Sequence, residues 1–514
     1  MYALKNIALH QWQAECLKRW FGNGRRGIAG VATGAGKTVL ALAVVSRLSE
    51  LCPEGSLKVK IIVPKIFLAG QWRDDILRCL RVRRRDIGLY YGEFKDSPDK
   101  PFMIYVLATA RRWAARHILE DARAGSSVFL ICDECHHFGS TENAHVFDFL
   151  PHMPAERYFA LGLSATPQGE NYEGVVVPAL GREIYRYDLA RASRDRITSD
   201  YMTFNIAVDF APDEEEKYLE LTEKITRLKT ALKRLFPSFC DGRGRVMPAY
   251  LRSLLRRADE VGELAQHLFI LYLRRKEVTH TARSRISCGM ELVRLLMPDC
   301  RMILFTERIR MADELYEMLR RSYPGRICRY HSHMDPRAKQ RALESYRQGE
   351  RSAIVCCRAL DEGLNVPETD AGILISATGN DRQRIQRIGR VVRLGAGLRP
   401  KKIYYLHVSG TTDPQEIIPQ KPGVAAHSLY YDSAANRFLH PEYDELAAKT
   451  LDKLAASGAT APRIENAEAQ LARGVVMGDF TLPEEACLRH IEDAGPEEKD
   501  YWIAMLLMSR ERAR

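Results

Sequence analysis

A short glycine-rich segment at residues 30–38 constrains this chain more than any other feature. It reads Gly-Val-Ala-Thr-Gly-Ala-Gly-Lys-Thr, after a mostly apolar approach at 26–31 and before a helix-forming run at 39–48. Glycines allow a tight turn in which successive backbone N–H groups, and the N-terminus of the next helix, point at a phosphate group. The sequence therefore predicts a phosphate-binding loop made by Thr33, Gly34, Ala35, Gly36, Lys37 and Thr38.

Two side chains of this loop suit a nucleoside triphosphate with Mg²⁺. Lys37 is predicted to reach the β- and γ-phosphate oxygens, and the Thr38 hydroxyl to hold the metal ion. The usual pattern starts with glycine five residues before Gly36, where this chain has Val31, so the general pattern is matched only from Gly36 onward. A chance glycine-lysine turn is the alternative, and the rest of the chain has to decide between the two.

A second predicted strand end supplies adjacent carboxylates. The continuous apolar run at 128–132 is typical of a buried strand, and Asp-Glu-Cys-His-His follows at 133–137. Asp133 is predicted to hold Mg²⁺ through its water shell, and Glu134 to orient or deprotonate an attacking water. Cys132 and Cys135, with the two histidines, suggest zinc as an alternative, although no second Cys or His pair follows at finger-like spacing.

A third strand end carries small hydroxyl side chains. The segment at 161–167 reads Leu-Gly-Leu-Ser-Ala-Thr-Pro. Ser164 and Thr166 are the candidates for a relay between the β-phosphate and a nucleic acid, and His136 is expected to reach this segment by a hydrogen bond. Ser-Ala-Thr alone is a weak signal, and its information comes from its order and spacing behind the first two motifs.

These motifs together resemble those of superfamily 2 DNA and RNA helicases of the DECH-bearing branch, which includes XPB-like helicases and type III restriction translocation subunits. The resemblance covers roughly residues 9–210 and 290–412. It implies an α/β fold with two tandem RecA-like parallel-sheet domains, and ATP and Mg²⁺ as cofactors. Hydrolysis in this class occurs at an interface between the lobes, where arginines from one lobe complete the site on the other.

Segments upstream of the two carboxylates extend the resemblance. Leu-His-Gln-Trp-Gln-Ala-Glu at 9–15 resembles the family's entry segment, which implies that Trp12 and Gln13 approach the adenine, although His10 stands where arginine is frequent. Ile-Ile-Val-Pro at 61–64, followed by Gln71-Trp72, resembles motif Ia, and the strand end at 106–109 resembles a later motif. The resemblance implies nucleic-acid backbone contacts at Pro64 and Thr109.

The second half of the chain resembles the second lobe of such a helicase. Residues 301–306 resemble motif IV, and 358–367 resemble motif V, which implies a nucleotide contact at Gly363, with Asn365 in place of the aspartate of many relatives. Residues 383–393 resemble motif VI and imply a nucleotide contact at Gln386 and arginine fingers at Arg390 and Arg393. These two arginines lie three apart and share one side of a helix. A solvated basic helix face formed by Arg384, Arg387, Arg390 and Arg393 is the alternative.

Composition agrees with a nucleic-acid partner without naming it. The chain has 514 residues, with 77 Lys and Arg against 66 Asp and Glu and a net charge of +11. A mildly basic surface suits a phosphate backbone but does not distinguish DNA from RNA. Arginine clusters at 81–85, 252–257 and 274–276 fit either a nucleic-acid contact or a solvated patch.

Cysteine usage and hydropathy predict an intracellular, cytoplasmic protein without a membrane segment. The 12 cysteines are scattered, the N-terminus lacks the pattern of a signal peptide, and no stretch approaches 18 uninterrupted apolar residues. Relatives with an iron–sulfur cluster carry four cysteines between motifs I and Ia, whereas only Cys52 lies there. No cluster is therefore expected.

Four regions are predicted: a first RecA-like domain at 1–210, a helical insertion at 211–288, a second RecA-like domain at 289–412 and an α-helical accessory region at 413–514. Leucines at helical spacing in the insertion, which also carries an arginine cluster, fit either a clamp over nucleic acid or a spacer. The last region shows no nuclease signature, so a nuclease or other effector subunit is expected on another chain, with this region as the candidate contact.

The resulting hypothesis is an ATP-dependent helicase or translocase that acts on DNA, with DNA favoured over RNA by the resemblance alone. An RNA helicase with the same ATPase is one alternative. The other is an ATP-gated nucleic-acid-binding switch that recruits an effector such as a nuclease in a defence or repair assembly.

Overall fold

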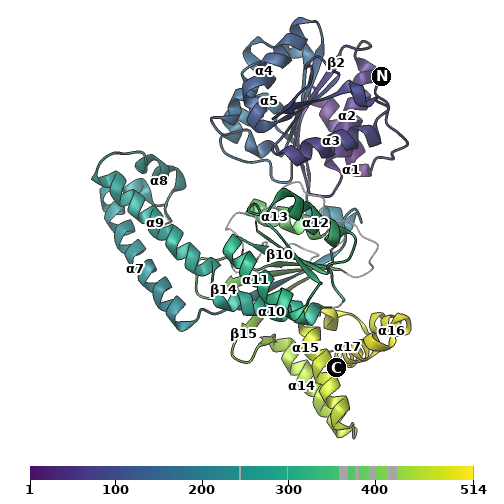
Figure 1. The fold of residues 1–514 in the computed structure, drawn as a ribbon, viewed down its shortest axis with the longest axis vertical. Coiled ribbons are helices and arrows are strands. Elements are labelled where there is room, and N and C mark those ends of the chain that lie inside the picture. Colours follow the sequence, from purple (N-terminus) through teal and green to yellow (C-terminus); the bar gives the residue numbers. More distant parts are fainter. Residues whose placement is uncertain are drawn as a thin grey trace. The chain divides into compact units, whose positions relative to one another are not determined.

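The computed structural model describes residues 1–241, 245–297, 299–357, 369–376, 381–392, 400–414, 416 and 425–512. These residues form two compact units. The first unit contains residues 1–200 together with 382–392 and 400, and the second contains the other described residues. Each unit is built around an eight-stranded sheet in which nearly all neighbouring strands are parallel (Figure 1). The predicted α/β fold with two parallel-sheet domains is confirmed.

The first sheet positions the predicted motifs at one edge. Its strands are β1 (Arg26–Val31), β2 (Leu57–Val63), β3 (Ile87–Tyr91), β4 (Phe94–Lys95), β5 (Phe102–Val106), β6 (Ser127–Asp133), β7 (Tyr158–Ser164) and β8 (Glu183–Tyr187). Their order is β4-β3-β5-β2-β6-β7-β1-β8, with only the β3–β4 pair antiparallel. The carboxyl ends of β1, β6 and β7 therefore meet at one edge of the sheet, as the order of the motifs requires.

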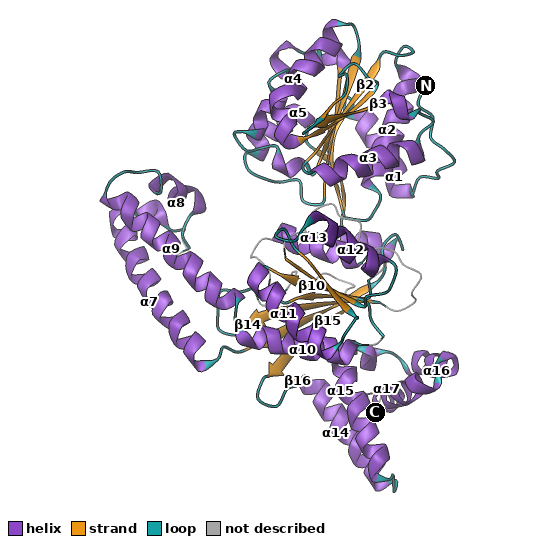
Figure 2. Cartoon of the chain, viewed as in Figure 1, coloured by secondary structure: helices purple, strands orange, loops and turns teal. Residues whose placement is uncertain are grey.

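Helices cover both faces of this sheet, which explains why its central strands are apolar throughout. Figure 2 shows α4 and α5 on one face and α1, α2 and α3 on the other. Ile28, Ile62 and Tyr105 of the sheet pack with Ala114 and Ile118 of α4 in one buried cluster. The helices of this unit are α1 (Gln11–Gly22), α2 (Lys37–Leu51), α3 (Ile66–Cys79), α4 (Leu107–Arg123), α5 (Val177–Leu180) and α6 (Leu189–Arg194), with most of α13 (Asp381–Val391).

The second sheet draws strands from three distant parts of the sequence. Its strands are β9 (Tyr201–Val208), β10 (Met302–Thr306), β11 (Ile327–Tyr330), β12 (Ala353–Cys357), β13 (Ala371–Leu374), β14 (Lys401–Val408), β15 (Ala425–Asp432) and β16 (Arg437–Leu439). Their order is β11-β12-β10-β13-β14-β9-β15-β16. Because β9 pairs with β14 along its whole length and Phe204 stacks on Tyr404 at 4.8 Å, this strand belongs to the second unit. The boundary between the units therefore lies at residue 200 instead of 210.

The predicted helical insertion forms an arm within the second unit. It consists of α7 (Pro212–Leu235), α8 (Pro248–Leu254) and α9 (Glu260–His280), and Figure 1 shows α7 and α9 side by side with α8 at their far end. Tyr218, Leu221 and Ile225 of α7 are buried in a cluster of the arm's own, with Leu268 and Leu271 of α9. The leucine-rich stripe read from the sequence is therefore a packing face.

The C-terminal region is part of the second unit's core. The remaining helices are α10 (Arg283–Leu296), α11 (Ile309–Ser322), α12 (Pro336–Arg347), α14 (Pro441–Ala456), α15 (Ala461–Met477), α16 (Glu484–Asp493) and α17 (Pro496–Arg512). The sequence predicted helices after residue 413, but β15 and β16 extend the sheet before α14 begins. The hydroxyl of Tyr404 in β14 donates to the carbonyl of Val476 at 2.7 Å, and Tyr443 and Met505 share the sheet's hydrophobic cluster.

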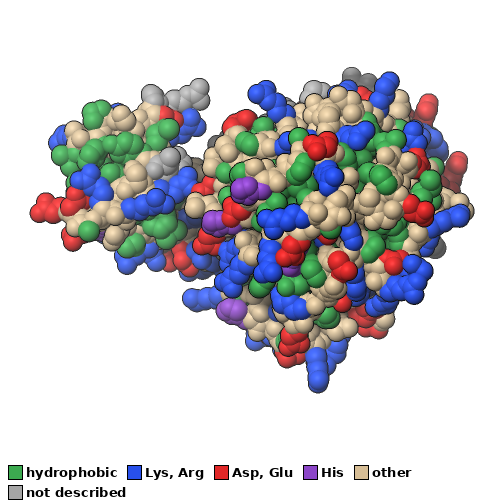
Figure 3. Space-filling view, turned by 90° about the horizontal axis from the view of Figure 1, so that it is seen from above, with side chains coloured by type: hydrophobic (Ala, Val, Ile, Leu, Met, Phe, Trp, Pro, Cys, Tyr) green, Lys and Arg blue, Asp and Glu red, His purple; other side chains and the backbone are tan. Residues whose placement is uncertain are grey.

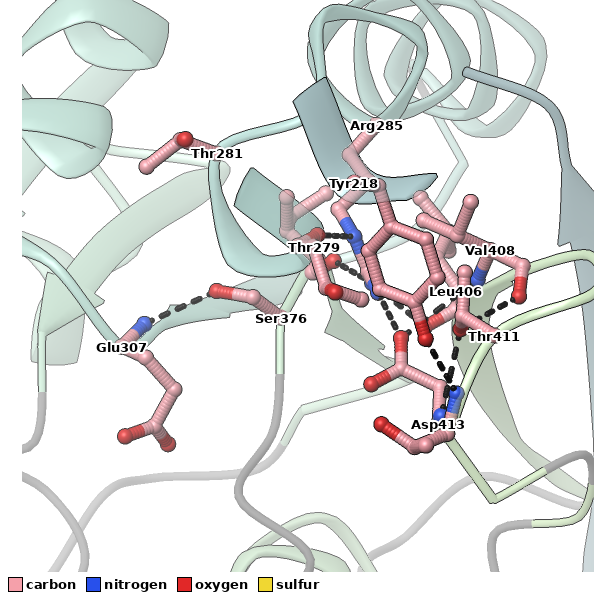
Figure 4. Close-up of polar contacts among 12 residues, drawn as sticks. Tyr218, Thr279, Thr281, Arg285, Glu307, Ser376, Leu406, Val408, Thr411 and Asp413 are labelled. Atoms are coloured by element: carbon pink, nitrogen blue, oxygen red, sulfur yellow. Dashed lines mark hydrogen bonds and ion pairs between the residues drawn. The ribbon is translucent and has the colours of Figure 1, made fainter. Parts of the chain in front are cut away.

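A buried arginine ties the base of the arm to this sheet. Arg285, only 1% exposed, donates from Nε to the Thr279 carbonyl at 2.8 Å and from Nη1 to the Leu406 carbonyl at 2.6 Å. Nη1 also donates to the Ile375 carbonyl, and Nη2 forms an ion pair with Asp413. Figure 4 shows Thr279, Leu406 and Asp413 around the Arg285 guanidinium. Among the described residues, no helix is both long enough and apolar enough to cross a membrane.

Candidate nucleotide-binding site

The predicted phosphate-binding loop connects β1 to α2. Gly34 and Gly36 have φ angles of 86° and 97°, in the left-handed region that favours glycine. Gly36 is the residue immediately before α2, so the loop delivers its backbone to the N-terminus of that helix. A Cβ atom at residue 36 would lie 2.8 Å from Nε2 of Gln13, so a side chain there would displace the Gln13 amide as well as strain the backbone. The loop thus has the geometry that phosphate binding needs.

A cavity of about 380 Å³ opens beside this loop. Most of the residues predicted for the nucleotide line it, namely Thr33, Gly34, Gly36, Lys37, Thr38, Asp133, Glu134 and Arg390. Side chains of α3 complete the wall, among them Gln71, Trp72 and Asp75. The volume falls within the usual range for small-molecule sites. The structure therefore brings residues from the loop after β1 and from α2, α3, β6 and α13 to one cavity.

Lys37 and Glu134 face each other across the cavity. Lys37 Nζ lies 3.2 Å from Glu134 Oε1, and both side chains are largely buried. Burial raises the pKa of Glu134, but the positive charge of Lys37 and the proximity of His136 outweigh burial and hold that pKa below its usual value. Glu134 is therefore a carboxylate at neutral pH, as a water-orienting group has to be.

Asp133 lies at the end of β6 with both carboxylate oxygens engaged. Oδ1 accepts from the backbone N–H of Glu134 at 3.1 Å, and Oδ2 accepts from the indole Nε1–H of Trp72 at 2.9 Å. Burial, followed by the negative charge of Glu134, raises the pKa of Asp133. Thr38 lines the same cavity, so a hydroxyl and a carboxylate face one space, and oxygen ligands of this kind fit Mg²⁺. Sequence reasoning missed the contact of Trp72.

The residues predicted to couple the motifs form one hydrogen-bonded group. His136 Nδ1 shares a hydrogen bond of 2.9 Å with Ser164 Oγ, and Ser164 Oγ donates to Glu134 Oε2 at 3.3 Å. The backbone N–H of Thr166 donates to the same Ser164 oxygen at 3.1 Å. The ends of β6 and β7 are thus linked directly at Glu134, through side chains that are almost entirely buried.

The entry segment at 9–15 contacts the phosphate-binding loop through Gln13. Nε2 of Gln13 donates to the Gly36 carbonyl at 3.0 Å, and its Oε1 accepts from the His10 backbone N–H at 2.9 Å. Trp12 is 1% exposed and stacks on Tyr187 with ring centroids 4.8 Å apart. The structure places Gln13 against the phosphate-binding loop and Trp12 in the core, and contact of either with adenine stays a prediction.

Helix α13 approaches the loop closely. A Cβ atom at Gly389 would lie 2.7 Å from Cβ of Thr33, so glycine is needed at this crossing. Arg384, Arg387 and Arg390 are each at most 5% exposed, and the interpretation of this helix as a solvated basic face is therefore wrong for them. Gln386 is also buried. The predicted residues Gly363 and Arg393 lie outside the described residues.

Pro64 and Thr109 lie at the same sheet edge as the nucleotide site. Pro64 follows β2, Thr109 is in the first turn of α4, and β2 pairs in parallel with β5, which leads into α4. Beside Pro64, Ile66 is 61% exposed. Nucleic-acid contact at Pro64 and Thr109 stays a prediction.

The distribution of basic side chains does not identify a nucleic-acid-binding surface. Figure 3 shows Lys and Arg spread over the visible face among acidic and apolar side chains. Within the predicted clusters, Arg275 packs over Tyr218 and Tyr272 and donates to Thr222 Oγ1 at 3.3 Å, which is a role within the arm. The other members of these clusters are exposed, which suits either interpretation made from the sequence.

Comparison with known families agrees with this arrangement. Residues 6–169 match the family described as type III restriction enzyme, res subunit, and residues 286–395 match the helicase conserved C-terminal domain. The chain carries both domains of a superfamily 2 helicase. It is thus an enzyme of the helicase class, and the resemblance inferred from its motifs is confirmed.

Relatives of this helicase include proteins described as DNA 3'-5' translocases and helicases. The chain is 26% identical over 390 residues to "DNA 3'-5' translocase XPB2" of Sulfurisphaera tokodaii, covering 75% of this chain and 79% of the relative. It is 21% identical over 425 residues to "Putative DNA 3'-5' helicase Rad25" of Haloarcula marismortui, covering 82% of this chain and only 56% of the relative.

One solved structure shares the fold over nearly the whole chain. The DNA-bound structure of the ATP-dependent type ISP restriction-modification enzyme LlaBIII aligns with 98% of this chain and 41% of its own, with a TM-score of 0.52 and 14% identity. At this identity the likeness concerns the fold.

Proposed function

We propose that this helicase is an ATP-driven motor that moves along or unwinds DNA, with Glu134 positioning the water that attacks the γ-phosphate. The observation that carries the proposal is the position of Glu134, which lies 3.2 Å from Lys37 and 3.3 Å from Ser164. A carboxylate held between a phosphate-binding lysine and a buried hydroxyl suits phosphoryl transfer to water. DNA as the substrate is supported by the two relatives, which are described as a DNA 3'-5' translocase and a putative DNA 3'-5' helicase.

Each residue of the site has a distinct role in this proposal. Backbone N–H groups of the loop and Lys37 bind the phosphates. Thr38 and Asp133 would hold Mg²⁺, which when bound neutralises charge on the phosphate oxygens. Arg390, which lines the same cavity, stabilises negative charge that develops during transfer. The bonds of Glu134 and His136 to Ser164 relay the state of the nucleotide to the end of β7.

ATPase rates with different nucleic acids test the proposal. Rates are measured with single-stranded DNA, duplex DNA, forked DNA and RNA, each at two salt concentrations. We expect strong stimulation by at least one DNA form, weakened by salt because phosphate contacts release counterions. Stimulation by RNA alone would identify an RNA helicase instead. An ATPase indifferent to every nucleic acid would refute the autonomous motor and favour a switch that recruits an effector subunit.

Two matched glutamine variants complete the test. Glu134→Gln is expected to bind nucleotide and DNA but to lose turnover, because the phosphate-binding loop and Asp133 are unchanged. Glu142→Gln, at an exposed glutamate of the same unit paired with Arg111, is the control and should retain full turnover. Near-normal turnover in Glu134→Gln would remove this residue from its proposed role.

A further inference from the structure

Helix α3 contributes a wall of the nucleotide cavity that the motifs of the loop and of β6 do not explain. Leu68, Gln71, Trp72, Asp75 and Arg78 all line the cavity and recur at intervals of three or four residues. They therefore share one face of α3, which is turned toward Lys37, Thr38 and Asp133. Trp72 is the member of this face that bonds directly to a carboxylate of the site.

The bond between Trp72 and Asp133 is buried and direct. Trp72 is 2% exposed and Asp133 is 9% exposed, and the indole nitrogen lies 2.9 Å from Oδ2. An indole N–H can only donate, so this contact has one polarity. Since an N–H bond to a charged acceptor is among the stronger hydrogen bonds, the rigid ring holds the carboxylate in one orientation.

These bonds leave part of the Asp133 carboxylate available to a metal ion. The Glu134 backbone N–H occupies one lone pair of Oδ1, and the Trp72 indole occupies one lone pair of Oδ2. A carboxylate offers about four acceptor sites in total, so acceptor sites remain on both oxygens. Thr38 lines the same cavity as Asp133 and would share the metal with it.

We propose that Trp72 is a positioning residue that orients Asp133 for Mg²⁺ bound with the nucleotide. The inference rests on the proposed function, because it assigns Asp133 to the metal. Outer-shell partners that orient a ligand in this way are worth about 10- to 100-fold in metal affinity or activity. Trp72 acts through Asp133, and its loss should weaken the contribution of Mg²⁺ without weakening the contribution of the phosphate-binding loop.

Equilibrium binding separates these two contributions. The affinity for a fluorescent non-hydrolysable ATP analogue is measured in excess Mg²⁺ and in EDTA, for the full-length wild type and Trp72→Phe. Phenylalanine keeps an aromatic ring and removes the donor. We expect the Mg²⁺-dependent gain in affinity to fall about tenfold in Trp72→Phe, while affinity in EDTA stays within about twofold of the wild type.

Trp20→Phe is the matched control. Trp20 is fully buried in the same unit, and its indole donates to the Ala160 carbonyl at 2.9 Å, so this variant also loses one buried indole hydrogen bond. It should keep the full Mg²⁺-dependent gain. An equal fall of the gain in both variants would show that Trp72 acts only through general stability, and would overturn the proposal.

A histidine variant tests the donor itself and also covers poor folding of Trp72→Phe. The imidazole ring overlays the five-membered ring of indole, with Nε2 in place of Nε1, so Trp72→His can restore an N–H at the same place. We expect Trp72→His to recover much of the Mg²⁺-dependent gain. If the Mg²⁺-dependent gain in Trp72→His is as small as in Trp72→Phe, the proposed role of Trp72 is overturned. An undiminished gain in Trp72→Phe would overturn it as well. Either result would leave the proposed function standing. If the wild type binds the ATP analogue neither in excess Mg²⁺ nor in EDTA, both the role of Trp72 and the proposed function are refuted.

Discussion

Replacing Gln13 by glutamate tests whether this side chain supports the phosphate-binding loop or reads the adenine. In the structure both ends of its amide are engaged, because Nε2 donates to the Gly36 carbonyl at 3.0 Å and Oε1 accepts from the His10 N–H. Gln13→Glu keeps the shape and the second contact. It replaces the donor opposite the Gly36 carbonyl by a carboxylate oxygen.

The expected cost follows from these two contacts. One hydrogen bond worth about 1 kcal/mol is lost. The Gly36 carbonyl keeps the Leu40 N–H as a donor but now faces a carboxylate oxygen, and this repulsion adds about 1 kcal/mol. A distortion of the loop worth about 2 kcal/mol weakens nucleotide binding about 30-fold, since each 1.4 kcal/mol is a factor of ten. Because the loop binds phosphates common to all nucleotides, ATP and GTP should lose affinity equally.

The assay is equilibrium binding of ATP and GTP analogues to the wild type, Gln13→Glu and an exposed control in the same helix, Lys18→Glu. Equal losses for both bases in Gln13→Glu alone would support the role in the loop. A selective loss for the adenine nucleotide would show that Gln13 reads the base and would refute its role as a support of the loop. Unchanged affinity for both would show that the bond to Gly36 does not shape the loop.

Three further outcomes are expected. Lys37→Ala should weaken nucleotide binding as well as turnover, since it removes a phosphate contact from the ground state, and unchanged affinity measured with a fluorescent analogue would contradict the assignment. Burial, followed by the charge of Lys60, lowers the pKa of His117 to about 4. The unfolded chain takes up this proton below about pH 6.5 and the folded chain does not, so stability is lost as the pH falls from about 6.5 to 4. His117 should contribute about 2 kcal/mol to the loss of stability between pH 7 and pH 5 in urea unfolding, so His117→Asn should reduce that loss and the exposed-site variant His145→Asn should leave it in place. Arg285→Met should destabilise the second unit by about 3–5 kcal/mol in thermal or urea unfolding, because it leaves Asp413 buried without its counter-charge, and a loss below about 1 kcal/mol would contradict this.

The strand ends of the nucleotide site were predictable because local chemistry specifies them. Glycines at 34 and 36 and the apolar run before Asp133 carry their own signals, and parallel strands bring their carboxyl ends to one edge. The contact of Trp72 with Asp133 joins residues 61 positions apart, and no spacing rule connects a helix residue with a strand end at that distance. The hydrogen bond of Gln13 to the Gly36 carbonyl could not be predicted from the sequence for the same reason.

The limits of the second sheet were harder to predict, because its strands come from distant parts of the sequence. Nothing local shows that β9 pairs with β14, which begins 200 residues later. In β15 the alternation of buried His427, Leu429 and Tyr431 with exposed neighbours is a two-residue period that the sequence does carry. Interpreting that segment as a loop before helices overlooked this signal.

The two ends of the arm meet where it joins the second unit. The backbone N–H of Arg283, at the start of α10, donates to Glu214 Oε1 near the start of α7 at 3.1 Å, and the Arg283 side chain pairs with Asp213. Because entry and exit adjoin and the arm has its own apolar cluster, it is a cassette that can be shortened, lengthened or exchanged without rerouting the sheet. Variation among such helicases can therefore accumulate in this cassette while the candidate nucleotide site stays as it is.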